Sequence, residues 1–457
     1  MTWSLDDTIV AVGTPLGEGG IGIIRLSGPE AAAILRRLFV PANSRARQAW
    51  APWRLCYGHV VEPAGGAVVD EALAVWMPAP KTYTRQDVAE MHCHGGPEPL
   101  RRVLELCLGA GARLAEPGEF TLRAFVNGRI DLAQAEAVVD VVRARSRRGL
   151  ETAIGQLQGQ LSARVGGLRG RLLGALAHLE AAIDFPQDEI PPCDLEGVLA
   201  QAEAELDRLL AGAEQGMVYR LGVRTAIVGR PNVGKSSLLN ALLRTERAIV
   251  TPVPGTTRDT LEETVVVGGV PLVLVDTAGI TQTADPVESL GVERSRRAAA
   301  AADLVLWVVD GSQPPMAEDR TIAGLLEGRT AVVVANKVDL GAAPGVETLL
   351  AERPLVRVSA LTGEGLAELE RVVVEAVLSG RAPADETPLV SRPRHAAALR
   401  RAREHVAAAR QARREGWPED CLAVDVSAAA AALGEITGET VTDDLVARIF
   451  SDFCLGK

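Results

Sequence analysis

A glycine-rich segment in the middle of the chain matches a phosphate-binding loop. Residues 229–236 are Gly-Arg-Pro-Asn-Val-Gly-Lys-Ser, the pattern G-x-x-x-x-G-K-[ST], between an apolar run and a helical pattern. In this setting backbone N–H groups can face phosphate oxygens, Lys235 adds a positive charge, and the Ser236 hydroxyl can bind Mg²⁺. The segment predicts a nucleotide site that includes Asn232, Val233, Gly234, Lys235, Ser236 and Ser237.

Three further motifs follow, each directly after an apolar, strand-like run. In Asp276-Thr277-Ala278-Gly279, the Asp can hold Mg²⁺ through water and the Gly N–H can meet a γ-phosphate. In Asn336-Lys337-Val338-Asp339, the Asp can accept hydrogen bonds from guanine N1–H and the 2-amino group, which adenine cannot supply. Ser359-Ala360-Leu361 would close over the base. Four motifs in this order indicate the GTPase superfamily.

We interpret the segment between the first two motifs as the switch, a loop that orders when GTP is bound. It contains Thr251, Pro252, Val253, Pro254, Gly255, Thr256, Thr257 and Arg258. Either Thr256 or Thr257 could complete the coordination of Mg²⁺.

Ile280 occupies the position, directly after Asp-x-x-Gly, at which Ras-like enzymes place the Gln that orients the attacking water. An aliphatic side chain cannot polarise water. Hydrolysis therefore needs another group, and the candidates are Glu288 or Glu293, a cation in place of an arginine finger, or Arg258.

The composition is that of an ordinary globular protein. With 457 residues, 47% hydrophobic and 23% charged, the chain has room for two to four domains. It has neither a basic start nor an apolar run of about 18 residues, so we expect a cytoplasmic protein. The six cysteines show no C-x-x-C spacing, which argues against a disulfide framework or a zinc knuckle. The net charge of −11 excludes a uniformly basic surface but not a local RNA-binding patch.

Lysine is rare in this chain. Of 48 Lys and Arg residues only Lys81, Lys235, Lys337 and Lys457 are lysines. A retained Lys is a candidate for a place that needs a compact ammonium rather than a planar guanidinium. Three of the four lie in motifs described in this section. Lys81 lies in none of them and could be a lysine without a functional role.

The remaining segments predict a multidomain fold with α/β and all-α parts. Residues 1–120 show a mixed pattern, with strands at 9–12, 21–26, 72–77 and 87–93, a capping box at 27–30 that opens a helix over 31–39, and mostly turn over 41–66. Residues 217–380 alternate strands with helices, as a parallel sheet requires.

Helical periodicity lies on both sides of this α/β region. It predicts helices over 132–144 and 195–210, one long helix over 150–183, and later helices over 395–414, 422–433 and 443–451. We therefore expect an α/β domain inserted into a helical domain, with domains at 1–120, 121–216, 217–380 and 381–457.

The nucleotide motifs, together with Phe453-Cys454-Leu455-Gly456-Lys457 at the C-terminus, closely resemble the MnmE (TrmE) family of tRNA modification GTPases. Further matching segments spread over the whole chain: 20–28, 94–96, 117–120, 131–136, 181–186, 255–259 and 434–438. The resemblance implies an N-terminal α+β domain that binds tetrahydrofolate and dimerises. It also implies a helical domain built from both flanks and an inserted P-loop GTPase domain.

The resemblance further implies K⁺-dependent GTP hydrolysis by two G domains that meet face to face. The family's K⁺ ligands fall on Asn232, Thr251, Val253 and Thr256. Its Mg²⁺ ligands fall on Ser236 and Thr257, and its water-orienting acid on Glu288. A K⁺ at Asn232 fits the substitution at Ile280, because it can place positive charge where other GTPases use an arginine finger.

The family's contacts to a 5-formyl- or methylene-tetrahydrofolate fall on Arg25, Glu90, Arg129 and Lys457. Taken alone, Arg25 and Glu90 would more simply be solvated strand ends. Arg129 stands where Lys is also familiar in the family, so the charge is kept. By itself Cys454 could be a small apolar filler; its place in the family makes it a catalytic candidate, for proton transfer or as a nucleophile.

The implied protein is a homodimer that works with an FAD-dependent partner of the MnmG (GidA) family in a heterotetramer-type complex. It adds a carboxymethylaminomethyl or aminomethyl group to carbon 5 of the wobble uridine of certain tRNAs, and GTP hydrolysis switches G-domain dimerisation. Arg-rich runs at 143–148 and 392–414 could meet tRNA phosphates or form a solvated helix face.

The alternatives are a ribosome-assembly GTPase and a regulatory GTPase, both without one-carbon chemistry. Absence of folate binding to residues 1–120 would favour the first. Equal support of hydrolysis by K⁺ and Na⁺ would favour the second.

Overall fold

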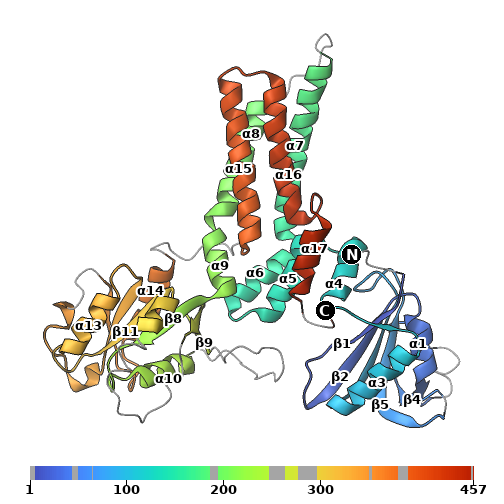
Figure 1. Ribbon diagram of the computed structural model, residues 1–457, viewed down its shortest axis with the longest axis horizontal. Coiled ribbons are helices and arrows are strands. Elements are labelled where there is room, and N and C mark those ends of the chain that lie inside the picture. The colour runs from blue at the N-terminus through green and yellow to red at the C-terminus, as the bar shows by residue number, and fades with distance from the viewer. Residues whose placement is uncertain are drawn as a thin grey trace. The chain divides into compact units, whose positions relative to one another are not determined.

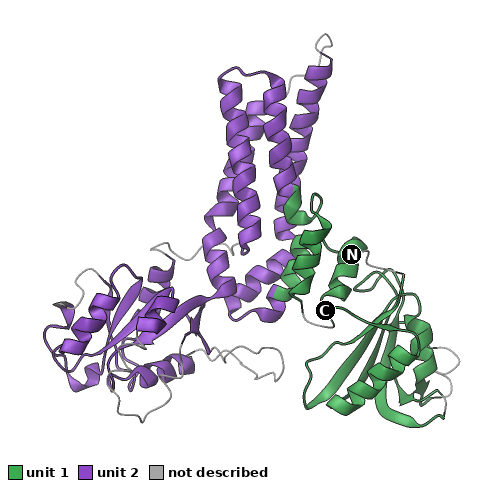
Figure 2. Cartoon of the chain, in the orientation of Figure 1, with its two compact units in different colours: residues 1–139, 251–258, 434–457 green, residues 140–250, 259–433 purple. Residues whose placement is uncertain are grey.

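A computed structural model of the chain describes residues 6–43, 50–63, 65–185, 194–245, 263–275, 296–348, 353–378, 390–453 and 456. Figure 1 labels the helices and strands, and Figure 2 shows two compact units. The first unit contains residues 1–139 and 434–457, and the second contains most of residues 140–433. Mixed sheets and long helices confirm the predicted multidomain fold class. The domain boundaries at 120, 216 and 380 stay predictions.

Within its described residues, the first unit is built on a seven-stranded sheet. In spatial order the strands are β3 (Phe39–Pro41), β4 (Cys56–Val61), β5 (Val68–Met77), β6 (Val88–Gly95), β2 (Gly19–Ser27), β1 (Ile9–Val12) and β7 (Arg113–Leu114). Helices α1 (Ala31–Leu38) and α3 (Pro97–Gly109) bury their apolar sides on this sheet. Removal of this apolar surface from water stabilises the unit.

Two short helices complete the first unit. Phe450 of α17 (Asp443–Ser451) packs with Leu122 of α4 (Glu119–Val126) in one buried cluster. This packing joins the C-terminal segment to the N-terminal part of the chain.

Two local predictions for the first unit are wrong. Residues 41–66, expected to be mostly turn, include strand β4, in which an added Cβ at Gly58 would collide with the Val40 carbonyl. Ser27 does not cap α1, because its hydroxyl lies 2.7 Å from Thr84 Oγ1 and the helix begins after Glu30 without a side-chain cap. In both places the tertiary contacts override the structure that the local sequence pattern predicted.

The described part of the second unit contains a six-stranded sheet. Its strands, in spatial order, are β13 (Leu355–Arg357), β12 (Ala331–Asn336), β11 (Leu304–Asp310), β8 (Val223–Val228), β10 (Val270–Leu274) and β9 (Thr264–Val267), all parallel except the pair β9–β10. Leu306 and Val308 of β11 belong to the cluster that includes α10 (Lys235–Thr245) and α14 (Leu366–Val377). Trp307 belongs to the cluster that includes α13 (Ala317–Leu325). Both faces are covered, which is why these strands are continuous apolar runs.

Two short 3₁₀ helices, η1 (Val338–Leu340) and η2 (Val346–Thr348), lie between β12 and β13 in the chain.

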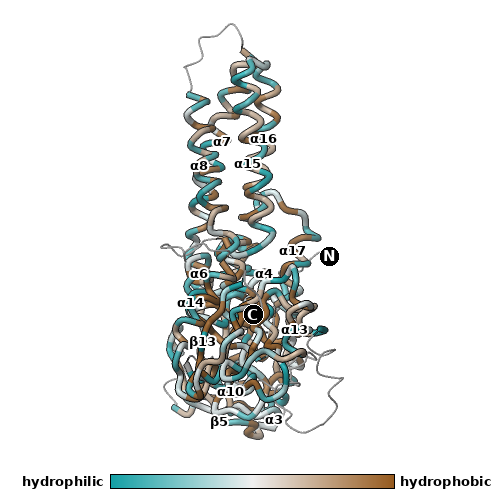
Figure 3. The backbone as a smooth tube through the Cα atoms, turned by 90° about the vertical axis from the view of Figure 1, so that its left-hand side faces the viewer, coloured by the Kyte–Doolittle hydropathy of each residue, from teal (hydrophilic) through white to brown (hydrophobic). Residues whose placement is uncertain are grey.

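The rest of the second unit is helical. The helices are α5 (Leu132–Arg143, whose start belongs to the first unit), α6 (Arg147–Leu157), α7 (Gln160–Asp184), α8 (Leu195–Ala211), α9 (Ala213–Leu221), α15 (Pro393–Arg414) and α16 (Glu419–Thr437, whose end belongs to the first unit). Figures 1 and 3 show α7, α8, α15 and α16 side by side. Arg403 of α15 pairs with Asp207 of α8 at 2.5 Å. Segments from before and after the nucleotide motifs therefore form one bundle.

None of the helices in the described ranges has both the length and the apolar character needed to span a bilayer. Figure 3 shows hydrophilic and hydrophobic stretches alternating along the bundle helices.

The helix predicted over 150–183 is two helices, so that prediction is wrong. Gly159 adopts a left-handed conformation with φ of 81°, which ends α6 and precedes α7. Glycine adopts this conformation without a Cβ penalty. The helical spacing of apolar residues is the same before and after Gly159, because α6 and α7 both bury residues in the second unit.

Candidate functional site

The phosphate-binding loop connects β8 to α10 in the second unit. Gly229 has φ of 149°, and an added Cβ would collide with the Val308 carbonyl of the neighbouring strand. Asn232 also has positive φ, at 62°. Helix α10 begins at Lys235, so its N-terminal N–H groups belong to the loop. This local geometry suits an anionic phosphate.

Lys235 is the cation of this loop. Its Nζ donates hydrogen bonds to the carbonyl oxygens of Gly229 at 2.7 Å and Arg230 at 2.9 Å. Burial lowers the pKa of the Lys235 ammonium. Among the described residues, the recorded partners of the Lys235 ammonium are these two carbonyls and no carboxylate, so its charge is available for a phosphate.

Asn336, at the end of β12, holds the base motif against the phosphate loop. It is 2% exposed, its Nδ2 donates to the Val233 carbonyl at 2.9 Å, and its Oδ1 accepts from the Ala360 N–H at 3.0 Å. An added Cβ at Gly234 would collide with the same Nδ2. Three predicted motifs that are far apart in sequence therefore meet here.

Asp339 lies on the base side of this arrangement. Its Oδ1 accepts a hydrogen bond of 2.6 Å from Ser359 Oγ, and the residue is exposed. Leu361 is 86% exposed. The Asp339 carboxylate is therefore oriented by a buried serine while remaining accessible.

Asp310, at the end of β11, is a residue of this region that the motifs did not indicate. Lys337 Nζ lies 2.8 Å from Asp310 Oδ2, and Lys337 has φ of 70°. Burial would raise the pKa of the Asp310 carboxyl, but Lys337 and Ser312 outweigh this effect and lower it. The ion pair holds Lys337 in place. In the sequence, Asp310 could have been noticed as an acidic residue at the end of an apolar strand.

The other predicted nucleotide contacts lie outside the described residues. They are Thr251, Pro252, Val253, Pro254, Gly255, Thr256, Thr257, Arg258, Asp276, Thr277, Ala278, Gly279 and Glu288. Of the predicted metal ligands, Asn232 and Ser236 fall within the described residues, on the loop and at the start of α10. Their side-chain oxygens are donors of the kind that Mg²⁺ and K⁺ accept.

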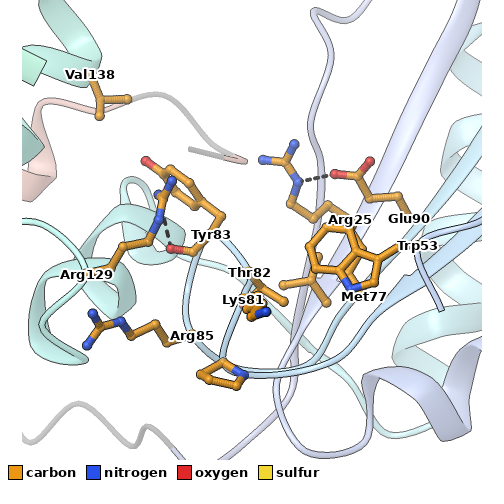
Figure 4. A pocket seen from close by; sticks show the side chains of 12 residues that line it. Arg25, Trp53, Met77, Lys81, Thr82, Tyr83, Arg85, Glu90, Arg129 and Val138 are labelled. Carbon is orange, nitrogen blue, oxygen red and sulfur yellow. Dashed lines mark hydrogen bonds and ion pairs between the residues drawn. The ribbon is translucent and has the colours of Figure 1, made fainter. Parts of the chain in front are cut away.

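A pocket in the first unit brings together three of the four predicted folate contacts. Its volume is about 560 Å³, and Figure 4 shows its lining residues: Arg25, Trp53, Met77, Pro80, Lys81, Thr82, Tyr83, Arg85, Val88, Glu90, Arg129 and Val138. Arg25 and Glu90 are register partners on β2 and β6, and Arg25 Nε donates to Glu90 Oε1 at 2.8 Å. The size and mixed lining are those of a small-molecule site.

Aromatic rings support both arginines of this pocket. The Arg129 guanidinium lies 4.7 Å from the centroid of the Tyr83 ring and donates to the Tyr83 carbonyl at 3.3 Å. The Arg25 guanidinium lies 5.9 Å from the centroid of Phe120. These contacts hold flat cationic groups in place.

The C-terminal tail contacts Arg25 of this pocket through Gly456. The Gly456 carbonyl accepts a bond of 3.5 Å from Arg25, and an added Cβ on Gly456 would collide with the Val12 carbonyl. The neighbouring candidates Cys454 and Lys457 lie outside the described residues.

Trp53, Lys81, Tyr83 and Arg85 were not predicted as site residues. Of these four, the sequence offered a reason to notice Lys81 alone, because lysine is rare in this chain.

Comparisons with known proteins cover nearly the whole chain. Residues 8–129 match the model of the GTP-binding protein TrmE N-terminus, and residues 132–454 match that of the MnmE helical domain. The G domain of the T. maritima FeoB iron transporter is 28% identical, covers 34% of this chain and 98% of its own, and has a TM-score of 0.25.

Two relatives match from end to end. The tRNA modification GTPase MnmE of Roseiflexus castenholzii is 52% identical over 466 residues, covering 99% of each chain. That of Chloroflexus aurantiacus is 53% identical over 457 residues, covering 99% of this chain and all of the relative. The chain therefore belongs to the MnmE family of tRNA modification GTPases.

Proposed function

We propose that this chain is a K⁺-dependent GTPase that, with an FAD-containing partner of the MnmG (GidA) family, modifies carbon 5 of the wobble uridine of certain tRNAs. The added group is carboxymethylaminomethyl or aminomethyl, and its one-carbon unit comes from a tetrahydrofolate derivative. The convergence of Arg25, Glu90 and Arg129 in one pocket carries this proposal. Family membership favours it over a ribosome-assembly or regulatory GTPase.

The pocket residues suit a folate. The Glu90 carboxylate can accept hydrogen bonds from the amino-pyrimidine edge of a pterin, while Arg25 and His92 hold its two oxygens at 2.8 and 3.2 Å. The Arg129 guanidinium presents donors that match a glutamate carboxylate. A bound tetrahydrofolate supplies the carbon, and Cys454 and Lys457 on the tail are the proposed groups that act beside it.

We expect Arg25→Ala to abolish the wobble modification while GTP hydrolysis stays within about twofold of wild type. Loss of Arg25 leaves Glu90 Oε1 without its guanidinium partner, so folate affinity should fall by about thirtyfold or more. The measurement is mass analysis of tRNA wobble uridines in cells that lack the native protein and carry the variant.

Arg37→Ala is the matched control, because it removes a cation from α1 of the same unit outside the pocket. A fully modified tRNA pool with Arg25→Ala would contradict the folate assignment.

In the nucleotide half, Ser236 and Thr257 are the proposed Mg²⁺ ligands and Asn232, Thr251, Val253 and Thr256 the proposed K⁺ ligands. Glu288 orients the attacking water in the absence of a Gln at Ile280. Hydrolysis accompanies the meeting of two G domains in a homodimer, and a K⁺ held by these residues would supply positive charge for the transition state.

We expect Asn232→Gly to lose the preference for K⁺, with hydrolysis in KCl falling by at least about tenfold toward the rate in NaCl. Glycine tolerates the positive φ of 62°, so this change removes the side-chain oxygen and keeps the loop conformation. Phosphate release in the two salts measures the effect. Asn240→Ala on the exposed side of α10 is the control. If the ratio of the hydrolysis rates in KCl and NaCl is unchanged in Asn232→Gly, then Asn232 is not a K⁺ ligand.

A further inference from the structure

The pocket of the first unit holds an excess of positive charge. Four basic side chains line it, together with one acidic side chain: Arg25, Lys81, Arg85, Arg129 and Glu90. Arg25 pairs with Glu90. In the part of the chain that the structure describes, the other three cations form no ion pair, and the two arginines among them donate only to backbone carbonyls. Three positive charges are therefore left for a ligand.

Two of these cations come from the loop between β5 and β6, at residues 78–87. Figure 4 shows Lys81 and Arg85 apart from the Arg25–Glu90 pair. Both side chains are exposed, whereas Arg25 and Glu90 are 26% and 15% exposed. The loop thus adds charge at the solvent side of the pocket.

Hydrogen bonds hold the backbone of this loop, so the points from which its cationic side chains extend are defined. Thr82 Oγ1 donates to the Gln86 carbonyl at 2.6 Å, and Asn127 Nδ2 donates to the Thr84 carbonyl at 2.6 Å. Thr82 and Thr84 are buried. A preorganised loop loses little freedom when it binds a charged group.

We infer that Lys81 and Arg85 bind the additional carboxylates of an oligo-γ-glutamate tail, so that the site prefers folates with several glutamates. A folate with one glutamate ends in two carboxylates, and each further γ-linked glutamate adds one. Lys81 carries a compact point charge on a flexible four-carbon stem, which suits a flexible chain of carboxylates. The inference rests on the proposed folate site and names the form of folate that it takes.

Phosphates of an RNA are the other polyanion that these cations could meet. The cations line a concave pocket together with Trp53, Met77 and Pro80 rather than an open basic stripe. This setting favours a small ligand.

The test compares calorimetric binding of mono- and triglutamyl 5-formyl-tetrahydrofolate to the full chain at low salt. We expect the triglutamate to bind about fivefold to tenfold more tightly, as two exposed ion pairs allow. In the double variant Lys81→Gln, Arg85→Asn this preference should disappear while monoglutamate affinity stays within about twofold. Asn is chosen because it tolerates the φ of 59° at Arg85.

Lys81→Gln alone alters no described contact and should remove part of the preference; Arg37→Ala should remove none. Equal binding of both folates by wild type, or a preference retained in the double variant, would overturn the inference and leave the folate site standing. If wild type binds neither folate, the folate site fails as well. A loss of tRNA binding with an unchanged tail preference would assign the cations to RNA and overturn the inference.

Discussion

Replacing Lys235 with Ala is expected to reduce kcat/KM for GTP hydrolysis by about a hundredfold to a thousandfold, the cost of removing one group that stabilises developing charge. Within the described ranges, the Lys235 ammonium is held by two loop carbonyls, at 2.7 and 2.9 Å, so it can turn to a phosphate. Steady-state phosphate release measures the loss, and thermal unfolding by circular dichroism shows whether the variant is folded.

Two further variants make this test specific. Lys235→Arg should lose most of the activity as well, because a planar guanidinium does not fit where a compact ammonium lies between two carbonyls. Arg244→Ala removes an exposed cation from the last turn of the same helix and should change little. Retention of more than a tenth of the activity by Lys235→Ala would contradict the role assigned to this residue.

Replacing Asp339 with Asn is expected to weaken GTP binding by about a hundredfold to ten-thousandfold. Two hydrogen bonds to a charged carboxylate are lost, and each contributes about 1.5–3 kcal/mol. Guanine presents two N–H donors, N1–H and the 2-amino group, whereas Asn offers one acceptor and one amide that opposes a donor with a donor. Ser359 keeps the side chain at position 339 oriented, since it donates to Oδ1 at 2.6 Å.

Xanthosine triphosphate distinguishes this effect from unfolding. Its 2-oxo group can accept from the Asn amide, so Asp339→Asn should bind it more tightly than wild type does. Competition binding with a fluorescent nucleotide measures both ligands. Glu364→Gln, which removes an exposed carboxylate nearby in the chain, is the control. Wild-type GTP affinity in Asp339→Asn would show that Asp339 does not contact guanine.

The sequence by itself determined the nucleotide motifs and the family. Each motif is contiguous, and its chemistry depends on backbone geometry that particular residues encode. Gly229 and Gly234 show why: an added Cβ at either position would collide with a neighbouring strand or with Asn336. The family resemblance read from these motifs and the C-terminal tail is confirmed.

The local sequence pattern predicted secondary structure less well where tertiary packing determines it. The apolar spacing of 150–183 continues across Gly159, so periodicity alone does not reveal the left-handed residue that divides the helix. Strand β4 escaped prediction because Gly58 is a poor strand former, yet it lets β3 approach closely.

The family resemblance named Arg25, Glu90 and Arg129 in advance, but only the tertiary structure showed that they line one pocket and which other residues line it. The register of β2 and β6 places Arg25 beside Glu90, and the fold adds Arg129 and Gly456 from later parts of the chain. Lys81 changed from an unexplained lysine to a pocket residue in the same way. Such a pocket is assembled by non-local packing, whereas a phosphate loop is formed by consecutive residues; the first therefore leaves no pattern in the sequence and the second does.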